Sequence, residues 1–114
     1  MICQRGERVS SSRAKIKCLT IVAEVILEQR ILDDLRACGA RGWTVTSARG
    51  AGPQHRQISD FEGGNSRIEV LVDAEVSERI WQLLERDYFP DFAVSAWLTD
   101  VEVARPDRYE TRPN

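Results

Sequence analysis

The order of strand-like and helix-like segments constrains the fold of this chain more than any other feature. Apolar residues alternate in four segments, as in a β-strand, and recur at helical spacing in two others. Strands are predicted over residues 15–23, 42–48, 66–72 and 92–104, and helices over 25–39 and after Asp73. The order β-α-β-β-α-β predicts an α+β, ferredoxin-like fold, with both helices on one face of an antiparallel four-stranded sheet.

Local signals mark several boundaries of these segments. Gly39 ends the first helical pattern, and Asp73 is a good N-cap for the second helix. We expect the last strand to break near Asp100. Residues 1–14 and 105–114 are polar and lack periodicity, which predicts a flexible tail at each end of a single domain over 15–104.

The first predicted strand is apolar on both faces. A sheet covered by helices on one side only would show a polar second face. Another subunit is the simplest cover for the second face, so the pattern favours an oligomer. The two sets of side chains are Ile16, Cys18, Thr20 and Val22 on one face, and Leu19, Ile21 and Ala23 on the other.

Composition narrows the class of protein. The 114 residues suit one small domain, and a net charge of −2 argues against a general nucleic-acid binder. No apolar run reaches the roughly 20 residues of a membrane span, and the first residues lack the apolar core of a signal peptide. Cys3, Cys18 and Cys38 have no CxxC spacing, so we expect free thiols and a cytoplasmic protein.

Few residues suggest catalysis or metal binding. Asp33 and Asp34 are expected on a solvated helix surface. His55 is the only histidine, and a lone histidine makes a poor metal site or hydrolytic base. Trp43, Trp81 and Trp97 fall within strand or helix patterns, which favours core or interface packing. We therefore expect no catalytic residues and no metal.

The segment between the second and third strands is too long for a tight hairpin. Residues 50–65 contain four glycines, and the arginines in and around them, Arg49, Arg56 and Arg67, suit anion binding. Gly50 and Gly52 would let backbone N–H groups approach a phosphate. A surface loop that binds nothing can have the same composition, so spacing alone leaves both interpretations open.

Two longer motifs resemble a known family. The segment GARGWTVTSARGAG resembles the second-strand signature of the PII signal-transduction family, and RIEVLVDAEVSERIWQLLERD resembles its third strand and second helix. The likeness covers about residues 15–104. It implies a homotrimer of ferredoxin-like subunits that binds adenine nucleotides in the clefts between subunits. Residues 50–65 would be the T-loop, the mobile loop that contacts a protein partner.

The resemblance also implies site residues. Thr44 matches the threonine that contacts adenine, and Glu69 and Leu71 match strand positions that line the cleft. The loop-base glycines correspond to Gly50 and Gly52, followed by the glutamine at Gln54. Arg49 and Arg56 would meet phosphate or bicarbonate. Three aromatic residues, Tyr88, Phe89 and Phe92, would pack against the adenine or the neighbouring subunit.

Two departures from the family pattern narrow the resemblance. The nucleotide-clamping B-loop, with its glycines and lysine, is replaced by ERDYFPDFAVS, and the T-loop contains no tyrosine to modify. DYFPDFAVSAWL resembles the aromatic segment of the PII-like branch linked to inorganic carbon. That branch includes carboxysome-associated PII-like proteins and, more distantly, the bicarbonate-transporter regulators. This branch favours AMP, ADP or cyclic AMP and, in some members, bicarbonate.

The sequence thus predicts a cytoplasmic sensor that is associated with carboxysomes. Its ligands would be AMP or ADP and bicarbonate, and it would signal to a protein partner through ordering of the T-loop. Two alternatives stay open: a weak nucleotide-hydrolysing enzyme, with His55 or Glu69 as base, and a metal-tolerance trimer of similar fold. The metal alternative would need a cluster of soft ligands.

Overall fold

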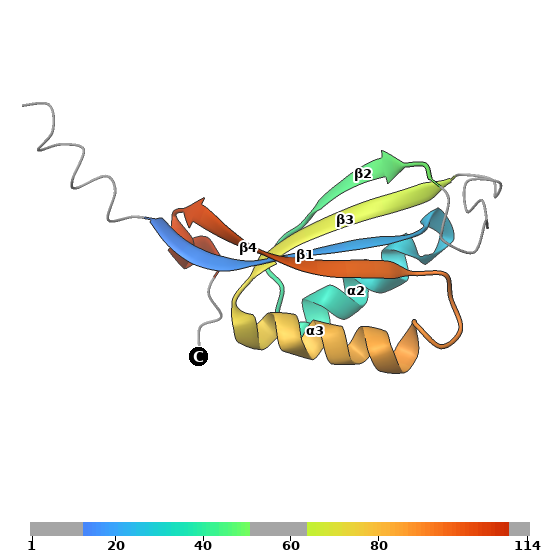
Figure 1. Cartoon of the computed structure of the whole chain (residues 1–114). Coiled ribbons are helices and arrows are strands. Elements are labelled where there is room, and N and C mark those ends of the chain that lie inside the picture. The colour runs from blue at the N-terminus through green and yellow to red at the C-terminus, as the bar shows by residue number, and fades with distance from the viewer. Residues whose placement is uncertain (1–12, 51–63, 110–114) are drawn as a thin grey trace, which may run out of the picture.

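Four strands form one antiparallel sheet. The computed structural model describes residues 13–50 and 64–109. The strands are β1 (Arg13–Glu24), β2 (Thr44–Ala48), β3 (Asn65–Val72) and β4 (Ser95–Ala104), and their order across the sheet is β2-β3-β1-β4. Every neighbouring pair is antiparallel (Figure 1). The predicted α+β, ferredoxin-like architecture is confirmed.

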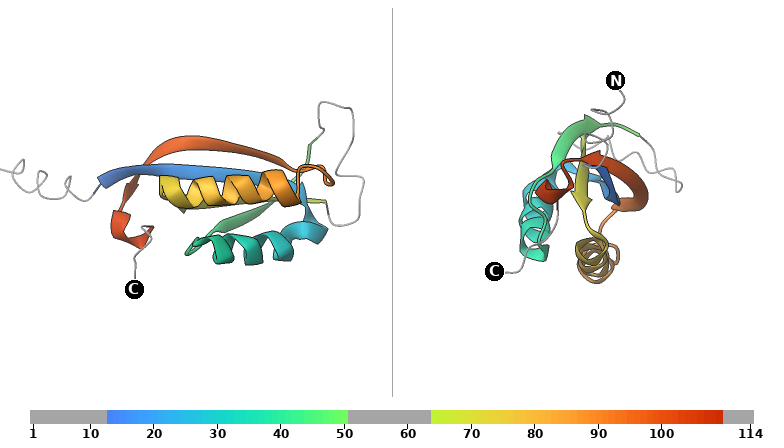
Figure 2. Two further views of the ribbon diagram at one scale, coloured as in Figure 1. Left: turned by 90° about the horizontal axis from the view of Figure 1, so that it is seen from below. Right: turned by 90° about the vertical axis from the view of Figure 1, so that its left-hand side faces the viewer.

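Both helices lie on the same face of the sheet (Figure 2). A short 3-10 turn, η1 (Val25–Leu27), leads from β1 into α2 (Glu28–Cys38), and α3 (Ala74–Asp87) follows β3. Gly39 ends α2 with φ 114°, a left-handed conformation that glycine adopts without steric cost. The Asp73 carboxylate accepts a hydrogen bond from the Val76 backbone N–H at 2.8 Å and caps α3. Both helix-boundary predictions are therefore confirmed.

The core lies between this face and the helices. Alternate residues of the central strands β1 and β3 point toward α2 and α3 and are almost completely buried. The helices contribute apolar residues at helical spacing to the same core. These buried residues are Leu19, Ile21, Ala23, Ile68, Val70 and Val72 from the strands, and Ile31, Leu35, Val76, Ile80 and Leu84 from the helices.

Some boundaries differ from the sequence prediction. β1 begins at Arg13, two residues before the expected start, because it pairs with β4 out to Ala104. β4 begins at Ser95, and it runs through Asp100 without a break. The Lys17 ammonium lies 2.6 Å from the Asp100 carboxylate across the strand pair. The expected break is therefore wrong, since β1 supplies both the backbone partners and a counter-ion for Asp100.

The two strands β1 and β4 extend together past the helices as a two-stranded ribbon (Figure 1). After the ribbon comes a second 3-10 turn, η3 (Pro106–Arg108). The Arg41 guanidinium donates a hydrogen bond to the Asp107 carbonyl at 3.3 Å, which connects η3 to the segment before β2. Residues 105–109, expected in a tail, thus include an ordered turn.

Candidate functional site

The sheet face opposite the helices, here called the open face, carries a row of four side chains from all four strands. Directly paired residues of neighbouring strands project from the same face. Thr44 on β2 pairs with Glu69 on β3, Glu69 pairs with Thr20 on β1, and Thr20 pairs with Trp97 on β4. The register therefore aligns a hydroxyl, a carboxylate, a second hydroxyl and an indole across the sheet.

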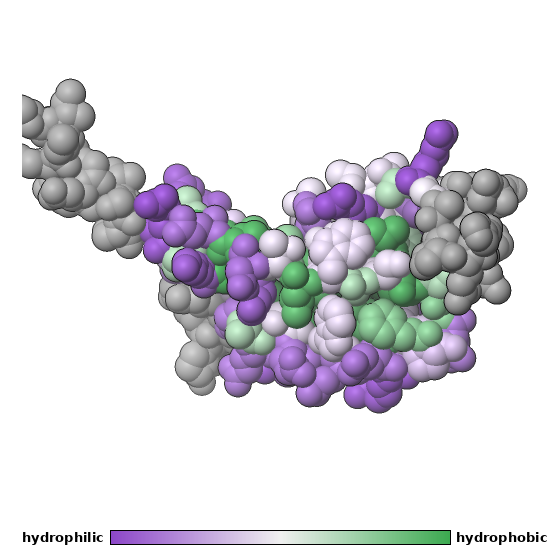
Figure 3. Space-filling model, in the orientation of Figure 1, coloured by the Kyte–Doolittle hydropathy of each residue, from purple (hydrophilic) through white to green (hydrophobic). Residues whose placement is uncertain are grey.

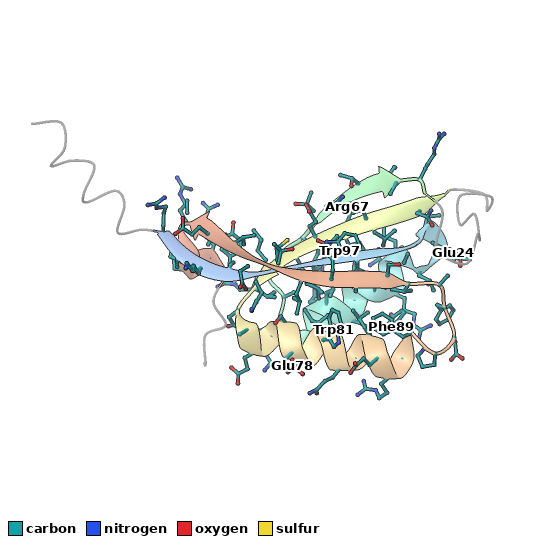
Figure 4. The ribbon with its side chains drawn as sticks, viewed as in Figure 1. Glu24, Arg67, Glu78, Trp81, Phe89 and Trp97 are labelled. Carbon is teal, nitrogen blue, oxygen red and sulfur yellow. The ribbon has the colours of Figure 1, made fainter. Side chains whose placement is uncertain are left out.

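Arg67 contacts two members of this row, Glu69 and Trp97. Its guanidinium lies 3.2 Å from the Glu69 carboxylate and 5.9 Å from the centre of the Trp97 ring. The side chains of Arg67 and Glu69 are 45% and 42% exposed, so this ion pair is in contact with solvent. Figure 4 shows Arg67 and Trp97 next to each other above the sheet. The open face thus presents a cation, a carboxylate and an aromatic ring within one cluster.

Trp97 is 43% exposed and Leu98, the next residue of β4, is 41% exposed. Because side chains alternate along a strand, Trp97 belongs to the open face and Leu98 to the helix side. Trp43 and Trp81, in contrast, pack against the core. Apolar and weakly polar surface gathers in the middle of the molecule, between more hydrophilic regions (Figure 3). The interface role expected for Trp97 fits this exposure, and the core role fits the other two tryptophans.

The ends of the long loop meet at one end of β2 and β3. Ala48, the last residue of β2, pairs with Asn65, the first residue of β3. Arg49 and Gly50 follow directly and are exposed. The Val25 N–H donates a hydrogen bond of 3.0 Å to the Gly64 carbonyl, which holds this loop base against η1. The Gly50 backbone and the Arg49 guanidinium are therefore accessible at the end of the open face nearest Arg67.

Asn65 adds an unusual feature to the loop base. The residue is 3% exposed, and its Oδ1 atom is buried with no hydrogen-bond partner in the part of the chain that the structure describes. A buried acceptor without a donor costs free energy. Asn65 is therefore suited to accept a hydrogen bond from a group outside the described residues.

The aromatic residues after α3 occupy a different place from Thr44 and Glu69. Phe89 stacks edge-on against Trp81, with ring centres 6.1 Å apart, and Phe92 lies 6.0 Å from the Tyr88 ring. Phe89 and Phe92 are partly buried and pack against the core. Figure 4 shows Phe89 close to Trp81. The structure therefore separates these two predicted site residues from the row on the open face.

Two expectations about side chains near α2 are wrong. Tyr88 was expected to meet adenine or a neighbouring subunit, but it is fully buried in the core of this chain. Asp34 was expected on a solvated surface, but it accepts a hydrogen bond from the Tyr88 hydroxyl. The segment after α3 must fold back over α2 to bury its apolar side chains, and this brings the two residues together. Asp33 is exposed as expected.

The predicted candidate residues thus fall into four groups. Thr44, Glu69 and Leu71 share the open face, and Arg49 and Gly50 lie at the loop base. Phe89 and Phe92 lie beside the helix layer. Gly52, Gln54, His55 and Arg56 lie outside the described residues. The structure adds Trp97 to the face that carries Thr20, a placement that depends on the register between β1 and β4 and that alternation along each strand does not specify.

Other chemistry in the described part of the chain is limited. Within residues 13–50 and 64–109, no group of three or more His, Cys, Asp or Glu side chains is arranged to hold a metal ion. Cys18 and Cys38 are free thiols, and burial together with the nearby Asp34 carboxylate raises the pKa of Cys38. None of the described helices has the length and apolar character needed to cross a membrane.

The fold and the open face define a ferredoxin-like α+β subunit whose polar site lies beside a long loop. The chain matches the family model described as Nitrogen regulatory protein P-II over residues 16–108, and it belongs to this family. The match includes both helices, the loop between β2 and β3, and the whole sheet except the first residues of β1. The resemblance stated from the sequence is confirmed.

Solved structures agree with this assignment. A PII-like signalling protein from Thermus thermophilus is similar at 41% identity and a TM-score of 0.75, over 86% of this chain and 98% of that one. CPII, a nitrogen regulatory PII-like protein from Thiomonas intermedia bound to ADP, AMP and bicarbonate, is similar at 18% identity and a TM-score of 0.78, over 87% and 97%. At that identity, the likeness to CPII shows the fold alone.

Proposed function

We propose that this chain is a regulatory sensor that binds AMP or ADP, and bicarbonate, in clefts between the subunits of a trimer. The observation that carries the proposal is the pairing of Thr44 with Glu69 on the sheet face that neither α2 nor α3 covers, next to Arg49 and Gly50 at the loop base. A hydroxyl and a carboxylate can recognise the edge of a base, while a guanidinium and backbone N–H groups suit a phosphate. The structure of CPII contains ADP, AMP and bicarbonate, which supports the same class of ligand for this chain.

The same open face provides a reason for assembly. Ile16 and Val101 pair on this face of the β1–β4 ribbon and are only partly buried in one subunit. Half-buried apolar strand surface favours a second copy of the chain as its cover. Subunit contacts along this face would close the site around Thr44 and Glu69, so that nucleotide binding depends on the trimer.

Signalling would use the T-loop, residues 50–65. Four glycines and two acidic residues give this segment little apolar surface with which to order itself. A ligand at Arg49 and Gly50, together with loop residues Gly52, Gln54 and Arg56, would favour one ordered form through its higher affinity for that form. The ordered loop would then contact a protein partner. We place this role in inorganic carbon metabolism, with carboxysome association, because an aromatic segment replaces the nucleotide-clamping B-loop.

Titration calorimetry with AMP, ADP, cyclic AMP and bicarbonate tests ligand binding directly. We expect saturable binding of AMP or ADP to the assembled protein. Amide hydrogen exchange then tests signalling: exchange across residues 50–65 should slow with saturating nucleotide, while β3 stays protected with and without it. Equal exchange in both states would refute loop ordering without affecting the binding result.

A further inference from the structure

We propose that Trp97 and Arg67 form a purine-nucleotide subsite on the open face, in which Trp97 stacks on the base and Arg67 moves from Glu69 to the phosphate. This inference rests on the proposed function and extends it to two residues that the family resemblance does not assign. The ligand class is a purine nucleotide with a 5′-phosphate. Four observations on the open face support it.

The first observation is the position of the indole. Trp97 lies in the same row as Thr44 and Glu69, with only Thr20 between Glu69 and Trp97. Adjacent strands are about 4.8 Å apart, so the backbone positions of Glu69 and Trp97 are separated by roughly 10 Å. Thr20 itself is buried, at 2% exposure, so a flat bicyclic base would lie over it, between Glu69 and Trp97, once Arg67 has moved. There it would present one edge to Glu69 and one face to the indole.

The second observation is what the indole contacts now. The planar Arg67 guanidinium lies above the Trp97 ring at 5.9 Å, near the outer limit for a cation–π contact. The ring remains 43% exposed. A flat, weakly held group thus occupies the place where a base would stack, and a base would cover more of the ring than the guanidinium does.

The third observation is that Glu69 has a replaceable partner. The ion pair between Arg67 and Glu69 is about half exposed, and pairs of this kind contribute little to stability. An ionised carboxylate only accepts hydrogen bonds. The exocyclic amino group of adenine can donate one to Glu69 and take the place of Arg67.

The fourth observation is the direction in which Arg67 lies. It precedes Glu69 by two residues on β3, which places it roughly 7 Å nearer the loop base along the strand. Arg49 and Gly50 lie at that end. With the base in the row of Glu69, the phosphate would reach the row of Arg67, where the released guanidinium can bind it with two hydrogen bonds.

The first experiment compares calorimetric affinities for AMP among the wild type, Trp97→Leu, Trp97→Phe and the control Leu98→Ala. Leu98 is the adjacent residue, has similar exposure and projects from the opposite face. Loss of stacking in Trp97→Leu should weaken AMP binding roughly 5- to 100-fold, with a smaller loss in Trp97→Phe and none in Leu98→Ala. Light scattering on each variant verifies that the assembly is unchanged.

Arg67→Met separates the two parts of the subsite. It should weaken AMP binding about 10- to 100-fold, because a charge-assisted hydrogen bond to phosphate is lost. Binding of adenosine, which has no phosphate, should be unchanged or tighter, because Glu69 no longer has a competing partner. Equal losses for AMP and adenosine would contradict the phosphate role.

Fluorescence provides a readout that is independent of these affinities. In the variant Trp43→Phe/Trp81→Phe, Trp97 is the only tryptophan, since the chain has three, and excitation at the long-wavelength edge of tryptophan absorption avoids the two tyrosines. Saturating AMP should quench its emission, whereas ribose 5-phosphate should not. Suppose that the wild type binds AMP, that AMP leaves the Trp97 emission unchanged, and that Trp97→Leu binds AMP as tightly as the wild type. These results together would overturn the subsite but not the proposed function. An absence of any nucleotide binding by the wild type would overturn the proposed function as well.

Discussion

The Tyr88 hydroxyl donates a hydrogen bond to the Asp34 carboxylate and so joins the end of α3 to α2. Tyr88 is fully buried, and the Arg30 guanidinium lies 4.7 Å from the centre of its ring and 5.4 Å from the Phe92 ring. One buried tyrosine thus links both helices and the segment before β4. The aromatic residues of this segment pack within the subunit.

Replacement of Tyr88 by phenylalanine should destabilise the protein. The change removes a hydrogen bond to a charged, partly buried acceptor, which lowers the free energy of unfolding by about 1.5–3 kcal/mol. Urea denaturation followed by circular dichroism measures the difference. Tyr109→Phe, near the end of the described chain, is the control and should change the free energy by less than about 0.5 kcal/mol. Equal stability of Tyr88→Phe and the wild type would show that the bond contributes nothing.

The same tyrosine predicts a dependence on pH. Burial, and then the hydrogen bond and charge of Asp34, raise the pKa of Tyr88 above its ordinary value. A tyrosine whose pKa is raised in the folded state makes its full contribution to stability at pH values below its unfolded-state pKa of about 10. This contribution is lost as the pH rises further. The stability difference between the wild type and Tyr88→Phe should therefore be constant below about pH 10 and shrink above it. A difference that grows with alkaline pH would contradict the prediction.

Gly39 and Gly42 provide a matched pair of glycines. Gly39 has φ 114°, and a Cβ atom there would lie 3.2 Å from the Arg79 guanidinium. Gly39→Ala should cost about 1–2 kcal/mol of unfolding free energy, since an L-residue is strained in the left-handed region. Around Gly42, a Cβ atom would meet nothing within 4 Å. Thermal unfolding should therefore show a lower Tm for Gly39→Ala and little change for Gly42→Ala.

Assembly can be tested at the apolar side of the ribbon. Ile16→Glu places a carboxylate on the open face beside Val101, where burial against another subunit would leave it unpaired. We expect a trimer for the wild type at micromolar concentration and a monomer for the variant, by multi-angle light scattering. Lys15→Gln, on the opposite face of β1, should remain a trimer. A monomeric wild type would contradict the trimer itself.

Nucleotide preference tests the assignment to the carbon-linked branch. The sequence between residues 85 and 95 contains neither the glycines nor the lysine of the B-loop that clamps ATP in the family pattern. AMP or ADP should therefore bind at least as tightly as ATP in calorimetric titrations with and without magnesium. A clear preference for ATP with magnesium would favour a nitrogen-sensing role instead.

The sequence by itself determined the elements and their order. Alternation and helical spacing are local properties, so they identified the four strands and two helices. Asp73 and Gly39 marked helix ends because a cap needs only its own neighbours in the chain. The same alternation separated the two faces of β1, and the order of the elements predicted that both helices cover only one of them. That another subunit covers the second face stays a prediction. Family motifs in β2 and β3 then pointed to Thr44 and Glu69.

Only the tertiary structure decided which distant residues meet. The register places Trp97 in the row of Glu69, and it brings Arg67 close to both of them. Such pairings join residues far apart in the chain and depend on how β1 aligns with two neighbours at once, which no local pattern specifies. Tyr88 lies in the core for the same kind of reason. Its burial depends on the space between α2 and α3, which exists only after both helices have packed on the sheet.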